Sequence, residues 1–159
     1  MTNAIQTREI QYTAADGSTL IGYYAAPENS QAIAGVIVAP EWWGRNEYTE
    51  QRARELAGHG YAALAIDMYG DKKVTTDAKQ AYEWMMQTFE DTETIVTRAS
   101  AALATLAQQT EVNADNVTSA KIRSLGKTNK AYAKGDLTLD VPVGTKSIVI
   151  ACPADKTGP

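Results

Sequence analysis

Hydrophobic and polar positions divide the first part of the chain into segments with different periods. Residues 8–14 and 19–27 carry strand signals, and the Asp16-Gly17 pair between them is a turn signal of the hairpin kind. We therefore expect an opening antiparallel hairpin. The segment "AIAGVIVAP", residues 32–40, is instead continuously apolar, which is typical of a strand covered on both faces by helices. We expect it to be a central parallel strand.

Helical spacing follows in residues 46–60, and Gly58 and Gly60 supply a stop signal at the end of this segment. The stripe with this spacing consists of Tyr48, Arg52, Ala53 and Leu56. The next segment, "YAALAIDMYG", predicts a second buried strand that ends at Asp67. Strand, helix and strand together predict a βαβ unit with a right-handed crossover.

Residues 76–109 again have a helical pattern, with an acidic break near residues 90–93 that indicates two helices. Small and apolar residues form one narrow face of the second helix, which suits a helix that lies flat on a sheet. This face consists of Ala99, Ala102, Leu103 and Leu106. Up to about Asp115 the pattern predicts an α/β fold with a mostly parallel sheet that opens with an antiparallel hairpin.

Residues 116–159 have a different character, because they are rich in Lys, Thr, Gly and Ser and contain short strand signals. The segments "DLTLDV" and "SIVIAC" are separated by "PVGTK", which indicates a C-terminal β-hairpin. We therefore expect two parts: an α/β domain over residues 1–115, the front half of a larger fold, and a β-rich segment over residues 116–159.

Composition excludes several classes of function. The chain has 159 residues, with 15 Lys and Arg against 19 Asp and Glu, and its net charge of -4 includes no basic block for nucleic acid. No apolar run reaches the roughly 18 residues that span a bilayer, and no secretory signal begins the chain. We expect no membrane association and a cytoplasmic location. One cysteine, Cys152, and one histidine, His59, predict neither an internal disulfide nor a transition-metal site.

Two motifs carry a family resemblance. The segment "APEWWGRNEY", followed by "RARELAGHGYAALAIDMYGD", resembles the dienelactone hydrolase family of the α/β-hydrolase fold, over about residues 5–115. The resemblance implies hydrolysis of a small ester or lactone by a cysteine or serine nucleophile with a histidine and an aspartate, and without metal or organic cofactor. It also implies that Glu41 lies near the nucleophile and that the Trp42 N–H is one donor of the oxyanion hole.

Two interpretations of Glu41, Trp42 and Trp43 are compatible with the sequence: a place in an active site, or a purely structural role. A carboxylate at the carboxyl end of a parallel strand, such as Glu41, lies where sheets of this kind bind ligands. The alternative is that Trp42 and Trp43 belong to the core and that Glu41 is a surface group that caps a helix. We expect Asp67 and Tyr69 to fix the loop after their strand. His59 should be exposed at the opposite end of the sheet.

The catalytic half of such an enzyme is not evident in the sequence. A nucleophile elbow has the pattern Gly-x-Ser/Cys-x-Gly, because only small flanking residues permit its strained backbone. By resemblance, the segment Val112 to Asp115 precedes this elbow and places the nucleophile near Arg123, but Ile122 stands where a glycine is needed. The fragment Ser124-Leu125-Gly126 is incomplete. No histidine follows it, so a base for the nucleophile is missing.

Two later residues could replace missing groups, but neither is well placed. Cys152 is followed directly by Pro153 and has no histidine to activate it, so a buried structural thiol is the favoured interpretation. Asp155 resembles the acid of a triad, but without a histidine it has nothing to orient.

Two hypotheses therefore remain. The first is a dienelactone hydrolase-like scaffold that acts on a small ester or lactone. The second is a catalytically inactive, truncated or chimeric protein, whose tail faintly resembles β-rich segments of phage structural proteins. A hydrolase sheet that is cut after about four of its usual strands would expose an unpaired edge, and a homo-oligomer could form through that edge. Sedimentation that finds a monomer over a wide concentration range would contradict this association.

Overall fold

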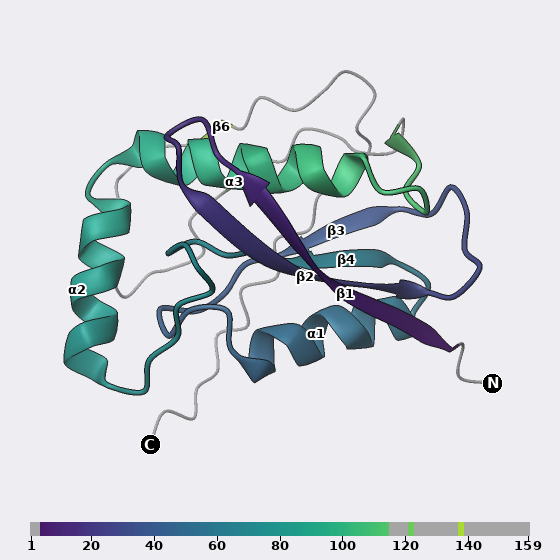
Figure 1. Ribbon diagram of the computed structural model, residues 1–159, viewed down its shortest axis with the longest axis horizontal. Helices are drawn as coiled ribbons and strands as arrows, with labels where there is room; N and C mark the ends of the chain where they lie inside the picture. The colour runs from purple at the N-terminus through teal and green to yellow at the C-terminus, as the bar shows by residue number, and fades with distance from the viewer. Residues whose placement is uncertain (1–3, 115–120, 123–136, 139–159) are drawn as a thin grey trace.

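The computed structural model describes residues 4–114, together with residues 121–122 and 137–138. Residues 4–114 form a four-stranded sheet with three α-helices around it (Figure 1). In chain order the elements are β1 (Ile5–Thr13), β2 (Thr19–Pro27), β3 (Gly35–Val38), α1 (Glu47–Gly58), β4 (Ala62–Ala65), α2 (Ala78–Phe89) and α3 (Thr92–Ala107). The short strands β5 (Lys121–Ile122) and β6 (Leu137–Thr138) pair antiparallel with each other.

The opening hairpin is confirmed. β1 and β2 pair antiparallel along their whole length, from Ile5 opposite Pro27 to Thr13 opposite Thr19. In the connecting turn the Ser18 N–H donates to the Asp16 carboxylate at 2.9 Å. Gly17 has a φ of 82°, which glycine adopts at little cost. Local turn chemistry was therefore sufficient to predict this element.

The order of the strands is β1-β2-β4-β3, and only β3 and β4 are parallel in this sheet. The prediction of a mostly parallel sheet is wrong for the described residues, because the hairpin joins the sheet through β2, which runs antiparallel to β4. The expected strand, helix and strand unit is present as β3, α1 and β4. β3 is last in the order of the described strands, so a central position for it stays a prediction.

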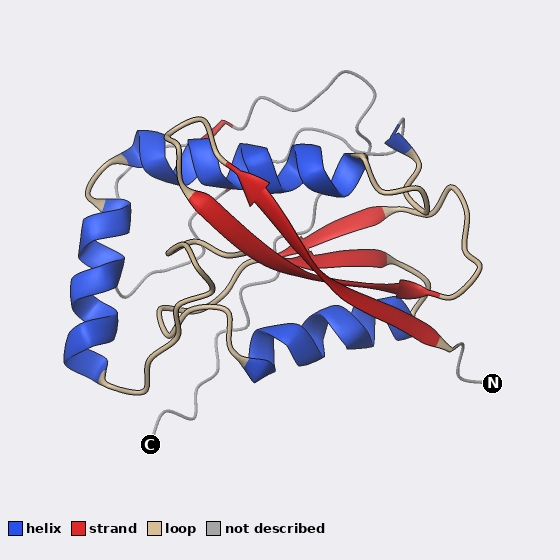
Figure 2. Cartoon of the chain, viewed as in Figure 1, coloured by secondary structure: helices blue, strands red, loops and turns tan. Residues whose placement is uncertain are grey.

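Helix α3 covers one face of the sheet and α1 covers the other, while α2 stands at one side (Figure 2). The predicted inner face of α3 is confirmed, since its four residues are all at most 5% exposed. It packs against Ile37 of β3 and Leu64 of β4 in one apolar cluster. Burial of such side chains is the main favourable contribution to folding.

The buried face of α1 includes only one residue, Ala53, of the helically spaced set named in the sequence. Thr49, Ala53 and Ala57 are its buried residues. Ala53 and Ala57 pack against Ala63 and Ala65 of β4, and these small side chains let the helix lie close to the sheet. Tyr48, Arg52 and Leu56 are only partly buried, and the Arg52 guanidinium lies 4.8 Å from the centre of the Tyr48 ring. A helical period alone did not identify which stripe faces the sheet.

Polar caps set the beginnings of all three helices. Asn46, Asp77 and Asp91 are the N-caps of α1, α2 and α3, and each side chain accepts a backbone N–H of the first turn. The predicted break near residues 90–93 is confirmed by the end of α2 at Phe89 and the start of α3 at Thr92. The predicted hairpin of residues 136–152 lies mostly outside the described residues, and only β6 belongs to it.

Candidate active site

The candidate site is the rim where the carboxyl ends of β3 and β4 meet. Because these strands are parallel, the segments that follow them, residues 39–46 and 66–77, leave the sheet at the same edge. Gly44 and Val74 form an antiparallel β-bridge between the two segments. The Thr75 N–H also donates to the Trp43 carbonyl at 3.0 Å. The fold therefore brings Glu41 and Trp42 beside a second loop.

A tight turn carries Glu41 and Trp42. The Gly44 N–H donates to the Glu41 carbonyl at 3.1 Å and closes the turn. Gly44 has a φ of 89°, and a Cβ atom placed on it would lie 2.0 Å from the Lys73 carbonyl oxygen. Only glycine fits this position, because a side chain would collide with the backbone of the neighbouring loop.

Asp67 organises the loop after β4, as expected. Its side chain is fully buried, and its two carboxylate oxygens accept four backbone N–H groups at 2.7 to 3.1 Å. The donors are the N–H groups of Ile21, Tyr69, Gly70 and Lys72. Three of them belong to the loop itself, and the fourth belongs to β2. A buried carboxylate with this many donors fixes backbone rather than performing chemistry.

Tyr69 also acts on the turn, because its hydroxyl donates to the Trp42 carbonyl at 2.8 Å. The ring of Tyr69 makes an edge contact with Trp84 of α2, with 5.6 Å between ring centres. Trp42 and Trp43 contact each other at 4.9 Å. All four aromatic side chains are partly exposed, so they form a wall of the rim and are not part of the buried core.

The simpler alternative for these residues does not hold. Trp42 and Trp43 lie outside the buried clusters, and Asn46, rather than Glu41, caps α1 through a bond from the Thr49 N–H at 3.2 Å. Glu41 is half-buried at the rim. Within the described part of the chain, no acceptor receives the Trp42 N–H. The turn therefore carries a backbone donor at the edge of the sheet and is held by the segment after β4.

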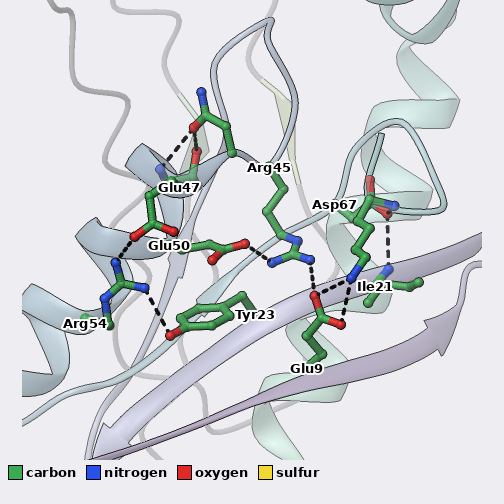
Figure 3. Close-up of polar contacts among 11 residues, drawn as sticks. Glu9, Ile21, Tyr23, Arg45, Glu47, Glu50, Arg54 and Asp67 are labelled. Atoms are coloured by element: carbon green, nitrogen blue, oxygen red, sulfur yellow. Dashed lines mark hydrogen bonds and ion pairs between the residues drawn. The ribbon is translucent and has the colours of Figure 1, made fainter. Parts of the chain in front are cut away.

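The sequence did not identify the ionic cluster beneath this turn. The Arg45 side chain is 1% exposed and donates to Glu9 at 2.7 Å and to Glu50 at 2.6 Å (Figure 3). Lys72 donates to both Glu9 oxygens at 3.0 Å. Glu9 is 36 positions from Arg45 and 63 from Lys72, so no local motif connects the whole cluster. The one local signal among these residues is Glu50 in the first turn of α1, where acidic side chains are common.

The pKa values of the two carboxyl groups in this cluster, Glu9 and Glu50, shift in opposite directions. Hydrogen bonds from Lys72 and Arg45 hold the pKa of the Glu9 carboxyl below its usual range. Burial raises the pKa of the Glu50 carboxyl, although the Arg45 charge opposes this shift. The difference follows their surroundings, because the Glu9 side chain is 45% exposed and the Glu50 side chain 21% exposed.

His59 is the one residue of the remaining candidates that the structure describes, and it lies away from this rim. His59 is exposed and follows α1, at the opposite end of β4 from Asp67, as predicted. Arg123, Ser124, Cys152 and Asp155 lie outside the described residues. The absence of a nucleophile elbow and the structural role of Cys152 stay predictions.

A hollow of about 640 Å³ lies away from this rim, beside the segment that leads into β3. Its lining includes Asn29, Gln31, Thr110 and Asn113. Among residues 4–114 and the two short strands, no group of three or more His, Cys, Asp or Glu side chains could hold a metal ion. The helices of this same part are too short or too polar to cross a membrane.

Comparison with known proteins connects this geometry to a family. A family model described as the dienelactone hydrolase family matches residues 20–120. A solved structure named m3DLH is 40% identical with a TM-score of 0.67, over 71% of this chain and 47% of that chain. A dienelactone hydrolase-like promiscuous phosphotriesterase from metagenomic libraries is 38% identical with a TM-score of 0.64, over 69% and 46%.

A shorter match covers a protein of Saccharolobus solfataricus that is provisionally named a carboxymethylenebutenolidase. It is 40% identical over 62 residues, which are 39% of this chain and 23% of that protein. The chain therefore spans about half the length of these two solved relatives and a quarter of this curated one.

Proposed function

The chain belongs to the dienelactone hydrolase family, and from that membership we propose that it is an ester or lactone hydrolase with Glu41 and the Trp42 N–H in its site. The observation that carries this proposal is the Trp42 N–H, which has no acceptor among the described residues and lies on a fixed turn at the carboxyl end of β3. Hydrolases of this fold bind substrate at this end of the sheet.

The proposed role of Trp42 follows from the charge that ester hydrolysis creates. Attack on a carbonyl carbon turns the carbonyl oxygen into an oxyanion, and a preorganised N–H stabilises that charge without moving. The turn is preorganised, because the Trp42 carbonyl accepts from the Tyr69 hydroxyl and the Trp43 carbonyl accepts from the Thr75 N–H. Glu41, on the same turn, is proposed to lie near the nucleophile and to influence its protonation.

The proposed substrate is a small uncharged ester or lactone. The partly exposed rings of Trp42, Trp43, Tyr69 and Trp84 supply an apolar wall at the rim, which suits such a molecule. The two-part organisation, with an α/β domain over residues 1–115 and a β-rich segment over residues 116–159, is proposed with it.

The test is hydrolysis of p-nitrophenyl acetate by the purified chain, compared with buffer. The Trp42→Pro variant removes the N–H, whereas Trp42→Phe retains it and serves as the matched control. We expect Trp42→Pro to lower kcat by about 100-fold or more and Trp42→Phe to change it only a few-fold. Circular dichroism establishes that each variant is folded.

Two further variants, Ser124→Ala and Cys152→Ala, identify the nucleophile, because loss of all turnover marks the residue that attacks the ester. Equal losses in Trp42→Pro and Trp42→Phe would contradict the role of the amide. A folded chain with no rate above buffer would contradict the proposed activity and favour the inactive, truncated or chimeric alternative.

A further inference from the structure

Arg45 is a buried cation directly after the turn that carries Glu41 and Trp42. Arginine is almost never buried to this extent unless it is paired. Its Nη1 group donates to Glu50 and its Nη2 group donates to Glu9 (Figure 3). Two carboxylates from different elements therefore hold one guanidinium in a fixed position. Charge-assisted bonds of this kind are shorter and stronger than neutral ones.

The partners of Arg45 connect the turn to three separate parts of the fold. Glu50 lies in the first turn of α1, and Glu9 lies in β1. Glu9 also binds Lys72, which belongs to the loop after β4. The Lys72 N–H donates to Asp67 at 2.7 Å, so the same residue is fixed at its backbone and at its side chain. The ionic cluster thus continues into the Asp67 network.

The remaining contacts hold the turn at its other positions. The carbonyls of Trp42 and Trp43 accept from Tyr69 and Thr75, and Gly44 forms a bridge with Val74. All of these partners belong to the segment after β4. Arg45 adds the connection to Glu9 of β1 and to Glu50 of α1. Because it adjoins Gly44, a shift of its backbone would move the turn.

We propose that Arg45 is a positioning residue, which fixes the Glu41–Gly44 turn against the loop after β4 through Glu9 and Glu50 and so orients the Trp42 N–H. It does not reach the reacting atoms, since its guanidinium is buried between carboxylates. The catalytic consequence rests on the proposed function, whereas the effect on the turn does not.

Hydrogen–deuterium exchange of the whole chain tests the effect on the turn. Arg45→Met retains an unbranched side chain but removes its charge and every side-chain donor. Arg45→Lys keeps the charge but loses the planar guanidinium that reaches two carboxylates at once. Arg52→Met is the matched control, because Arg52 lies on α1, is 40% exposed and pairs only with Glu55 among acidic side chains of the described part.

In Arg45→Met we expect exchange at the amides of Gly44, Asn46 and Thr75 to accelerate at least about tenfold more than exchange in α3. These amides are hydrogen-bonded within the turn or to it. Arg45→Lys should give an intermediate effect, and Arg52→Met none. If Arg45→Met does not fold, the comparison of Arg45→Lys with Arg52→Met decides the question. Equal acceleration in α3 and in the turn, or no acceleration, would overturn the proposal.

Kinetics test the catalytic consequence separately. If the wild-type chain hydrolyses esters, Arg45→Lys should lower kcat at least about tenfold while KM stays within about twofold, because a misplaced donor weakens binding of the transition state more than that of the substrate. A change in KM alone would contradict this consequence. Absence of wild-type turnover would refute the proposed function and would leave the exchange result to decide the role of Arg45.

Discussion

Gly44 and Gly17 show how the same residue type serves different purposes. Both have a positive φ, 89° and 82°, but only Gly44 has a neighbour in the way of a side chain. The obstacle is the Lys73 carbonyl oxygen, which belongs to a backbone that cannot rotate aside. At Gly17 nothing lies within 4 Å of the added atom. Conformational freedom is needed at both positions, and close approach is needed only at Gly44.

We predict that Gly44→Ala destabilises the protein by about 3 kcal/mol, since it combines backbone strain with a collision. Gly17→Ala should cost only about 1 kcal/mol, the penalty of a left-handed backbone for alanine. Urea denaturation followed by circular dichroism measures both values. Equal losses of stability in the two variants would show that the loops after β3 and β4 separate without cost, which would contradict the close contact between Gly44 and the Lys73 carbonyl.

Asp67 was correctly expected from its sequence position to fix a loop, because a carboxylate directly after a strand readily accepts nearby N–H groups. Three of its four N–H donors lie within five positions of Asp67 in the chain, so their bonds follow from the local sequence. The fourth, the Ile21 N–H, is 46 positions away. Arg45 had no such local signal, since its partner Glu9 is 36 positions away.

At the scale of elements, α1 and α3 use different side chains to cover the two faces of one sheet. α3 buries two leucines, Leu103 and Leu106, whereas α1 buries small residues against the alanines of β4. The α3 side therefore carries the larger apolar volume. Gly35 of β3 belongs to this arrangement, because an added Cβ would lie 3.0 Å from Leu106. Most of the stabilisation from helix packing should come from α3.

Leu103→Ala tests this assignment. Leu103 is 1% exposed, so its truncation should leave a cavity and cost about 3 kcal/mol in the free energy of unfolding. Met86→Ala on α2 is the control, because Met86 is 38% exposed and its truncation should cost less than about 0.5 kcal/mol. Thermal and urea denaturation give both values. A loss below about 1 kcal/mol for Leu103→Ala would contradict the placement of α3 on the sheet.

At the scale of the whole molecule, a polar cluster joins the two ends of residues 4–114. Glu111, after α3, accepts from Arg8 of β1 at 3.2 Å and from the buried Tyr24 hydroxyl of β2 at 3.1 Å. The Arg8 guanidinium lies 4.2 Å from the centre of the Tyr24 ring. Burial alone would raise the pKa of the Glu111 carboxyl, but the hydrogen bonds from Arg8 hold it below the usual range.

The lowered pKa values of Glu9 and Glu111 predict acid sensitivity. Their stabilisation is complete above the unfolded pKa, near 4.5, and is lost as the pH falls through the lower folded values. Urea midpoints should therefore fall below about pH 4.5. Glu111→Gln should lower the midpoint at pH 7 and reduce the further loss in acid. Glu28→Gln, at an exposed position, is the control, and identical acid curves for all three proteins would refute the assignment.

The sequence by itself determined the parts of this protein that depend on neighbours in the chain. The hairpin follows from its turn residues, the break between α2 and α3 from an acidic segment, and the family from motifs around Glu41 and Asp67. Only the tertiary structure decided the mixed strand order, the stripe of α1 that faces the sheet, and the burial of Arg45. These depend on contacts between residues far apart in the chain, which no local period or motif encodes.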